Sequence, residues 1–430
     1  MDLKEKFART QIRLDSVSPS FCLAKWLQVT LHLQNGFNHS CHHPDPHKIP
    51  LEGLNADPSS LHNTPFKKEL RALMKKGVRP YECEYCWRVE DAPGSQVSDR
   101  ILKSSDEWAE PLLDKIAQSD AHASIDPTYV EVSFGNECNF RCSYCSPSYS
   151  SALWNSFERH GAYVGRPTLA QTRAQGRAPL PAADNPYVKA FWQWFPSLVS
   201  NLKVFRITGG EPLINPNTFR VLDYLDEHPQ PHLQLCVNSN LGVPQPLFEK
   251  FIVKVKTLTE AGKLKDFMLY TSIDTHGEQA EYLRVGLEYD VWLSRVRQYL
   301  STVPWNVTFM VTFNALSVPR FSQLLDDLLQ LNGDFLGKNS GKRTLLDISH
   351  LMYPEYFSVW ILNPRWIEVI QQLADKMEHH SSQRVGPHGF QDYEIYKMKR
   401  VAAAYHEKAK RKRGGQSDAS LRSGISPERR

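Results

Sequence analysis

The chain has 430 residues, of which 41% are hydrophobic, so it can bury one large α/β unit and one or two smaller parts. Its formal charge is +4, and much of the excess lies in the carboxyl-terminal tail, so global charge does not favour a nucleic-acid-binding protein. The amino terminus is charged, and no run reaches the ~18 apolar residues that a membrane helix requires. We therefore expect a cytoplasmic protein without a signal core or a membrane span.

Four cysteines stand in residues 1–100, which we predict to form a cysteine-rich metal-binding domain. They are Cys22, Cys41, Cys83 and Cys86, the last two in a C-x2-C knuckle. Four thiolates form a closed zinc or iron–sulfur site, and spacing alone does not separate the two metals. His39, His42 and His43 flank Cys41, and we expect them to be loop or capping residues rather than ligands. Eight cysteines are too sparse for a disulfide scaffold, so their clustering favours metal binding in a reducing compartment.

Short β-rich runs alternate with helical stretches over residues 125–385, which is typical of βα units and a parallel sheet. The expected strands are Tyr129–Phe134, Lys203–Thr208, Leu233–Val237, Phe267–Ile273, Val307–Phe313 and Leu346–Leu351. Six such strands fit a partial (β/α)6 barrel related to the TIM barrel. Asn215-Pro216 and Asn363-Pro364 each predict a helix start, because asparagine caps a helix and proline suits its first turn.

Three further cysteines directly follow the first of these strands. They are Cys138, Cys142 and Cys145, in the spacing C-x3-C-x2-C. Three thiolates are one fewer than a closed site takes, so a four-iron cluster held here keeps one iron open for a substrate or cofactor. A structural metal knot would need a fourth ligand that the neighbouring sequence does not offer, and three unrelated cysteines are the remaining alternative. We favour the reactive cluster.

A Gly209-Gly210-Glu211-Pro212 turn ends the second expected strand about seventy residues later. The glycines let the backbone approach a neighbour closely, and the proline stops the strand. Together, the cysteine loop and this turn resemble the radical S-adenosylmethionine superfamily. The resemblance implies a four-iron cluster on the three cysteines, whose open iron chelates the amino and carboxylate groups of S-adenosylmethionine. It also implies that Tyr144 lies beside the adenine and that the turn contacts the methionyl amino group.

Polar residues near the ends of later strands are assigned to the cofactor by the same resemblance. They are Asn238, Ser272, Arg284 and Asn314. In related enzymes a serine on the fourth strand touches the ribose or carboxylate, and an arginine about a dozen residues on pairs with the carboxylate, which suits a guanidinium fork. The plain alternatives are helix caps, loop contacts and a surface ion pair. Position favours the cofactor role for Ser272 and Arg284 and leaves Asn314 evenly balanced.

The amino-terminal domain resembles the auxiliary-cluster modules called SPASM or twitch domains, although those modules mostly follow the barrel and this domain precedes it. Four thiolates would close the second site, which favours a structural or electron-relay role for a second four-iron cluster. A zinc-stapled domain that binds the substrate is the main alternative.

Two further segments are set apart by composition. Residues 146–186 form a long connection rich in Ser, Ala, Pro and Gly, for which we expect a lid or a partner-binding insertion. Residues 386–430 are expected to form a basic extension, with a helix over Gln391–Arg413 and a disordered tail from Gly414. We interpret the basic tail as a solvated extension, with weak contact to RNA or an acidic partner as a minor alternative.

The resemblance implies an enzyme that cleaves S-adenosylmethionine reductively to a 5′-deoxyadenosyl radical, which abstracts hydrogen from a substrate. The protein would position that radical, and no catalytic base is predicted. A flavodoxin- or ferredoxin-type protein would supply the electron, and auxiliary-cluster relatives favour a peptide or protein substrate. The alternative is a zinc-stapled, non-enzymatic module that binds RNA or protein, but it leaves the cysteine loop and the Gly-Gly turn unexplained.

Overall fold

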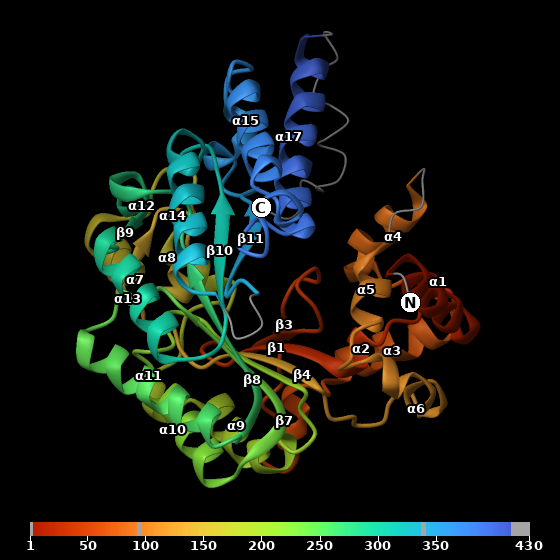
Figure 1. Ribbon diagram of the computed structural model, residues 1–430. Helices are drawn as coiled ribbons and strands as arrows, with labels where there is room; N and C mark the ends of the chain where they lie inside the picture. The colour runs from red at the N-terminus through yellow and green to blue at the C-terminus, as the bar shows by residue number, and fades with distance from the viewer. Residues whose placement is uncertain (1–2, 93–96, 337–340, 414–430) are drawn as a thin grey trace.

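The computed structural model describes residues 3–92, 97–336 and 341–413, which form a mixed α/β fold around one nine-stranded sheet (Figure 1). The strand order is β11-β10-β8-β7-β6-β4-β1-β2-β3. Six of these strands are parallel and neighbour one another in chain order. They are β4 (Tyr129–Ser133), β6 (Val204–Thr208), β7 (Gln230–Ser239), β8 (Leu264–Ser272), β10 (Val307–Phe313) and β11 (Thr344–His350). The sequence predicted all six, so the α/β class and the partial barrel are confirmed.

Helices connect these strands and cover the outer face of the sheet (Figure 1). They are α9 (Pro186–Leu198), α10 (Pro216–Glu227), α11 (Gln245–Glu260), α12 (Gly277–Leu283), α13 (Tyr289–Thr302), α14 (Phe321–Asp334) and α15 (Trp366–His379). Helix α10 begins as predicted, because the Asn215 side chain accepts a hydrogen bond from the Asn217 backbone N–H at 2.9 Å. The predicted start at Asn363-Pro364 is wrong by two residues. There the Asn363 side chain accepts from the Arg365 N–H at 3.2 Å in a turn, and α15 begins at Trp366.

The two faces of the sheet differ in polarity, as the two-residue period of a strand requires. Phe205 is fully buried and packs on Phe195 of α9, with ring centroids 5.3 Å apart. The next residue, Arg206, lies on the inner face, where its Nε donates to the Asn238 side chain at 2.9 Å and its guanidinium covers the Tyr270 ring at 4.1 Å. The interior of the partial barrel is therefore polar.

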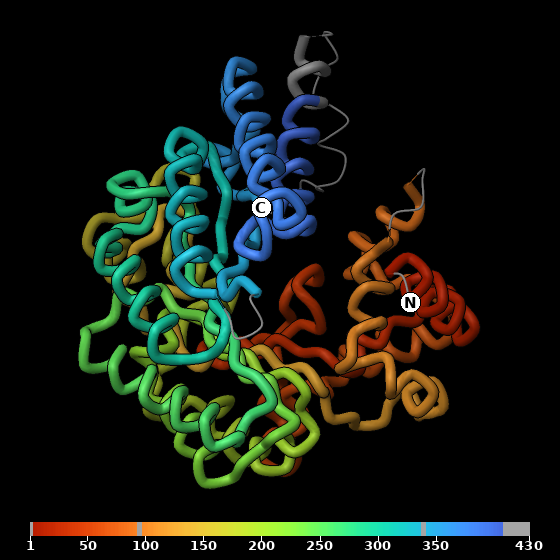
Figure 2. The backbone as a smooth tube through the Cα atoms, in the orientation of Figure 1, coloured from red at the N-terminus to blue at the C-terminus, as the bar shows by residue number. Residues whose placement is uncertain are grey.

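The amino-terminal segment also contributes to the sheet, which the sequence analysis did not anticipate. Strand β1 (Gln28–His32) pairs in parallel with β4, and β2 (Phe37–His39) and β3 (His47–Lys48) continue antiparallel at the edge. The rest of the segment forms a helical lobe around a second core, beside the barrel (Figure 2). Its helices are α1 (Leu3–Val17), α2 (Ala24–Leu27), α3 (Pro65–Lys75), α4 (Glu84–Asp91), α5 (Asp99–Ser104) and α6 (Leu113–Gln118).

The long connection over residues 146–186 folds into α7 (Ser151–His160) and α8 (Leu169–Ala174) with short turns. Its end is tied to the amino-terminal strands, because the Leu180 N–H donates to the Gln34 carbonyl at 2.7 Å and the Asn185 side chain donates to the Leu33 carbonyl at 2.8 Å. The expected role as a lid or partner-binding insertion stays a prediction.

After α16 (Ser382–Val385), the predicted helix near the carboxyl end is confirmed as α17 (Asp392–Arg413), which packs on α15 and β11. The predicted disordered tail from Gly414 lies outside the described residues. None of the helices in the described part of the chain combines the length and apolar character needed to cross a membrane.

Candidate cluster and cofactor site

The loop that follows β4 at the carboxyl edge of the sheet carries the three clustered cysteines. Cys142 lies in a two-residue strand, β5 (Arg141–Cys142), which pairs antiparallel with β9 (Arg284–Val285). The Cys145 N–H donates to the Cys142 carbonyl at 3.0 Å, and the Cys138 N–H donates to the Ser151 hydroxyl at 3.0 Å. These hydrogen bonds fix the loop so that each thiol lies within electrostatic reach of another.

Burial sets the protonation state of these thiols. It raises the pKa of Cys138 and of Cys145 to about 12 and also raises the pKa of Cys142, although Arg284 opposes the last shift. Without a metal the three side chains are therefore thiols at neutral pH, and bound metal would replace their protons. Because nearby thiolates raise one another's pKa, the site suits a cationic metal centre rather than three free nucleophiles.

Arg284 and Tyr144, both predicted to contact S-adenosylmethionine, converge on Asp274 just past the end of β8. Arg284 donates from Nε and Nη2 to the two Asp274 carboxylate oxygens at 2.9 and 3.0 Å, and its Nη1 donates to the Cys142 Sγ at 3.7 Å. The Tyr144 hydroxyl donates to Asp274 at 2.6 Å. Asp274 is a central acceptor that the sequence analysis did not include among the site residues, and its signal is an acidic residue directly after the predicted strand Phe267–Ile273.

The Gly-Gly-Glu-Pro turn packs against the backbone immediately before Cys138. Gly209 has φ +116°, and a Cβ there would lie 2.4 Å from the Ser133 hydroxyl. A Cβ at Gly210 would lie 2.2 Å from the Glu137 carbonyl oxygen, closer than real Cβ contacts come. The glycines are therefore required for close contact between this turn and the cysteine loop. The contact with the methionyl amino group stays a prediction.

Glu211, the third residue of the turn, is buried and ties β6 to β7. Its carboxylate accepts hydrogen bonds from the Ser239 hydroxyl at 2.8 Å and from the Asn240 and Leu213 N–H groups at 2.6 and 3.0 Å. Burial raises the pKa of Glu211 to about 7, although the three donors oppose the shift. Its side chain therefore has a structural role within the chain.

The other predicted cofactor residues differ in how available their side chains are. Asn238 lies half-buried on the inner face beside Arg206. Ser272 ends β8, and its hydroxyl has no hydrogen-bond partner among the described residues. Asn314 is fully buried, and its side chain bonds the Thr312 carbonyl and the Leu316 N–H, so it shapes a turn. Of the three, Ser272 is the freest to contact a ligand.

The four amino-terminal cysteines, although distant in sequence, line one small cavity in the helical lobe. They are Cys22, Cys41, Cys83 and Cys86. Burial raises the pKa of Cys41 to about 11 and that of Cys83 to about 12, and the thiols add to one another's shifts. Lys25 lies against them, fully buried and paired with Glu82. Although burial lowers it, the neighbouring Cys83 and Glu82 raise the pKa of Lys25 above its ordinary value.

The spacing of the cysteine sulfurs tests which metal they fit. Within the described part of the chain, the one group of three or more ligand atoms that all lie within 4.8 Å of one another is His42, His43 and Asp99. A zinc ion binds sulfur at about 2.3 Å, so the thiolate sulfurs around one tetrahedral zinc would lie closer than 4.8 Å to one another. A four-iron cluster binds each thiolate to a different iron and so spreads the sulfurs further apart. Among the described residues, no three sulfurs of either cysteine group lie within 4.8 Å of one another.

The three histidines that flank Cys41 have protein partners. His42 and His43 hydrogen-bond Asp99 from Nε2 at 3.1 and 2.8 Å, beside the four-thiol cavity. His39 bonds the Cys41 carbonyl from Nδ1 and His32 from Nε2. These contacts give all three histidines a part in shaping the loop around Cys41.

No protein-family model and no curated protein matches the sequence. Among solved structures, the chain is similar to native anSMEcpe with bound AdoMet, at 15% identity and a TM-score of 0.37, over 61% of this chain and 64% of that chain. It is also similar to Streptococcus suis SuiB bound to S-adenosylmethionine, at 11% identity and a TM-score of 0.35, over 83% of this chain and 70% of that chain. The chain thus spans less than two thirds of anSMEcpe. TM-scores this low carry no functional inference, and the function proposed below rests on the chain's own residues.

Proposed function

We propose that this protein is a radical S-adenosylmethionine enzyme. The observation that carries the proposal is a group of three clustered thiols, buried at Cys142 and partly buried at Cys138 and Cys145. They stand on a loop at the carboxyl edge of six parallel strands, and the Gly-Gly turn packs against that loop. Three thiols without a fourth protein ligand suit a four-iron cluster with one open iron. When bound, the cluster and S-adenosylmethionine supply a 5′-deoxyadenosyl radical that abstracts hydrogen from the substrate.

The residues around the loop would hold the cluster and orient the cofactor. Arg284 donates to the Cys142 sulfur and brings a positive charge beside the thiolates, which stabilises their deprotonated form. Asp274 fixes the guanidinium and the Tyr144 ring through three hydrogen bonds. A cofactor carboxylate bound by Arg284 would have to displace Asp274. Among the predicted cofactor contacts, Ser272 is the most available to a ligand, because its hydroxyl has no hydrogen-bond partner among the described residues.

The four amino-terminal thiols would hold a second four-iron cluster. The resemblance to auxiliary-cluster modules supports iron–sulfur over zinc, and the buried Lys25 would offset part of the negative charge of such a cluster. Four thiolates close the site, so it would relay electrons or stabilise the lobe rather than bind substrate directly. We further propose a peptide or protein substrate and a flavodoxin- or ferredoxin-type electron donor.

The test is made anaerobically on the full-length protein. Iron, sulfide and zinc are measured after reconstitution, followed by dithionite-dependent release of 5′-deoxyadenosine, in wild type, Cys142→Ala and the control Cys236→Ala. Cys236 is buried in β7, away from both groups. About eight irons, with release abolished only in Cys142→Ala, would support two clusters and the enzyme.

The same measurement separates the alternatives. About four irons and one zinc per chain would keep the enzyme and make the amino-terminal site a zinc staple. Zinc without sulfide or 5′-deoxyadenosine release would overturn the proposal in favour of a zinc-stapled protein that binds RNA or protein.

A further inference from the structure

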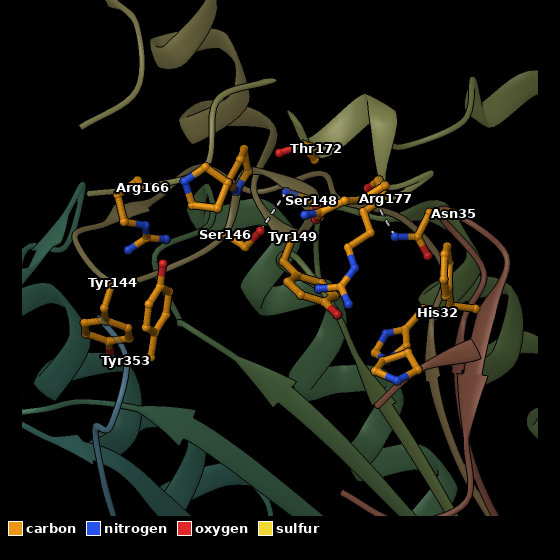
Figure 3. A pocket seen from close by; sticks show the side chains of 15 residues that line it. His32, Asn35, Tyr144, Ser146, Ser148, Tyr149, Arg166, Thr172, Arg177 and Tyr353 are labelled. Carbon is orange, nitrogen blue, oxygen red and sulfur yellow. Dashed lines mark hydrogen bonds between the residues drawn. The ribbon is translucent and has the colours of Figure 1, made fainter. Parts of the chain in front are cut away.

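Three metal-ligand side chains converge in the amino-terminal lobe, outside both cysteine groups. His42 and His43 follow Cys41 in its loop, and Asp99 is the first residue of α5 (Figure 1). Within the described residues, no other set of three histidine, cysteine, aspartate or glutamate side chains brings its ligand atoms within 4.8 Å of one another. None of the three lines the cavity of about 260 Å³ beside Tyr144 that Figure 3 shows, so this group and that cavity are separate features.

The two histidines aim the same ring nitrogen at one oxygen of the Asp99 carboxylate. The distances from Nε2 of His42 and of His43 to Asp99 Oδ2 are 3.1 and 2.8 Å. A tetrahedral zinc ion, bound at about 2.0–2.1 Å, holds its nitrogen and oxygen ligands about 3.4 Å apart. The rings and the carboxylate would therefore separate by only about 0.3–0.6 Å to accept the ion.

Other contacts hold these ligands ready for a metal ion. Asp99 lies in the first turn of α5, and the His43 ring stacks on the Tyr85 ring of α4, with centroids 3.7 Å apart and 14° between the ring planes. In the neutral rings each Nε2 carries hydrogen, because a carboxylate oxygen only accepts. Neither Nδ1 has a hydrogen-bond partner among the described residues, so the hydrogen of each ring can move there and leave the Nε2 lone pair for the ion.

The group is open to solvent on the side of His42. The His42 side chain is 62% exposed, whereas those of His43 and Asp99 are 14% and 22% exposed. Three protein ligands leave one position of a tetrahedral ion for water or for a donor atom of another molecule. Lys103 acts electrostatically on Asp99, but its side chain lines the four-thiol cavity, where metal-bound thiolates would offset its charge.

We propose that His42, His43 and Asp99 bind one zinc ion through two imidazole nitrogens and a carboxylate oxygen, with the fourth position open. Imidazole suits zinc and related late transition metals, whereas magnesium prefers an octahedron of oxygen ligands. His43 and Asp99 also line the four-thiol cavity, so the ion would lie in the wall of that cavity. This site goes beyond the proposed function and requires neither a cluster nor S-adenosylmethionine.

The test measures zinc binding to the full-length reconstituted protein by isothermal titration calorimetry, after dialysis against EDTA has emptied the exposed sites. Iron, sulfide and zinc are assayed before and after the titration to verify that the metal held by the thiols is unchanged. The variants are His42→Gln and Asp99→Asn, and His42 is exposed enough for its variant to fold normally. The control is His122→Gln, because His122 is 54% exposed and lies 3.1 Å from Glu69 and 3.8 Å from Asp120 without forming a compact group.

Wild type should bind one zinc ion in addition to the metal held by the thiols, and magnesium should not compete. Loss of a group that merely supports a metal ligand costs about 10–100-fold in affinity, so loss of a ligand should raise the zinc dissociation constant at least about tenfold. We expect this rise in His42→Gln and Asp99→Asn and an unchanged constant in His122→Gln.

Three results would overturn the assignment. They are no additional zinc in wild type, the same dissociation constant in His42→Gln as in wild type, and an equal loss of affinity in His122→Gln, which would indicate binding by scattered surface histidines. Release of 5′-deoxyadenosine is not part of this measurement. The zinc site and the proposed function can therefore fail independently.

Discussion

Arg284 and Asp274 form a two-pronged ion pair at the carboxyl edge of the sheet, with the carboxylate fully buried and the guanidinium side chain only 8% exposed. The third donor of the same arginine lies on the Cys142 sulfur. The pair therefore joins the end of β8 to the cysteine loop, although the two are far apart in sequence.

Breaking this pair should be costly, because it leaves a buried charge without a partner. We expect Asp274→Asn to lower the free energy of unfolding by about 3–5 kcal/mol. Asp334→Asn is the matched control, since the Arg297–Asp334 pair is partly exposed and should contribute less than about 1 kcal/mol. Urea denaturation of both variants measures the difference. Equal losses in the two variants would mean that the buried pair contributes no more than a surface pair.

Gly210 should tolerate no side chain, because a Cβ there overlaps the Glu137 carbonyl oxygen. We expect Gly210→Ala to destabilise the protein by about 1–3 kcal/mol and to reduce iron retention by shifting the cysteine loop. Gly333→Ala, in α14 with open space around it, serves as the control and should be neutral or slightly stabilising. Unfolding curves and iron content decide the matter, and full iron retention in Gly210→Ala would show that the loop accommodates the methyl group.

Glu211 should make stability depend on pH. Its pKa is about 7 in the folded chain against an ordinary value of 4.5, so the folded state holds one more proton than the unfolded state between these values. Its contribution to the free energy of unfolding is fully present below about pH 4.5. This contribution falls by about 1.4 kcal/mol per pH unit up to about pH 7 and then stays constant.

This fall should disappear in Glu211→Gln and persist in Glu249→Gln, which alters an exposed glutamate on α11. Urea unfolding from pH 4.5 to 8 gives the comparison. A fall of the same size in Glu211→Gln and wild type would assign the pH dependence to other groups.

The amino-terminal thiols should control about half of the bound iron. Cys41→Ala removes one of the four ligands, so we expect iron to fall from about eight to about four per chain. Release of 5′-deoxyadenosine from the site at Cys142 should continue in this variant. Unchanged iron with lost zinc would instead identify the amino-terminal site as zinc.

The barrel could be predicted from the sequence because each parallel strand is a continuous β-rich run between helix signals. Strand β1 was missed, although Val29 and Leu31 alternate with Gln28, Thr30 and His32, because the run lies in a segment interpreted only as a cysteine-rich metal-binding domain. Two of its polar residues, Gln28 and Thr30, are buried, and such burial depends on contacts that no local pattern reveals.

In the candidate site, too, some residues are predicted by a local motif, whereas others are brought together only by the folded sheet. The spacing of Cys138, Cys142 and Cys145 is a local signal, and one loop is enough to bring them together. The position of the Glu211 side chain, turned toward β7, depends on Ser239 and Asn240, which come from the end of the next strand and the residue after it. Long-range pairs of this kind follow from the assembled sheet and could not be derived from motif spacing.

Strand β1 also fixes the separation of the two cysteine groups. Cys22 precedes β1, at the amino ends of the parallel strands, and Cys138 follows β4, at their carboxyl ends. The two strands pair over five residues. Five residues of strand span about 16 Å, so a rigid, hydrogen-bonded ladder lies between the groups. An electron that passes from one to the other would cross a gap set when the sheet assembles, and substrate binding could alter the driving force for that transfer but not its distance.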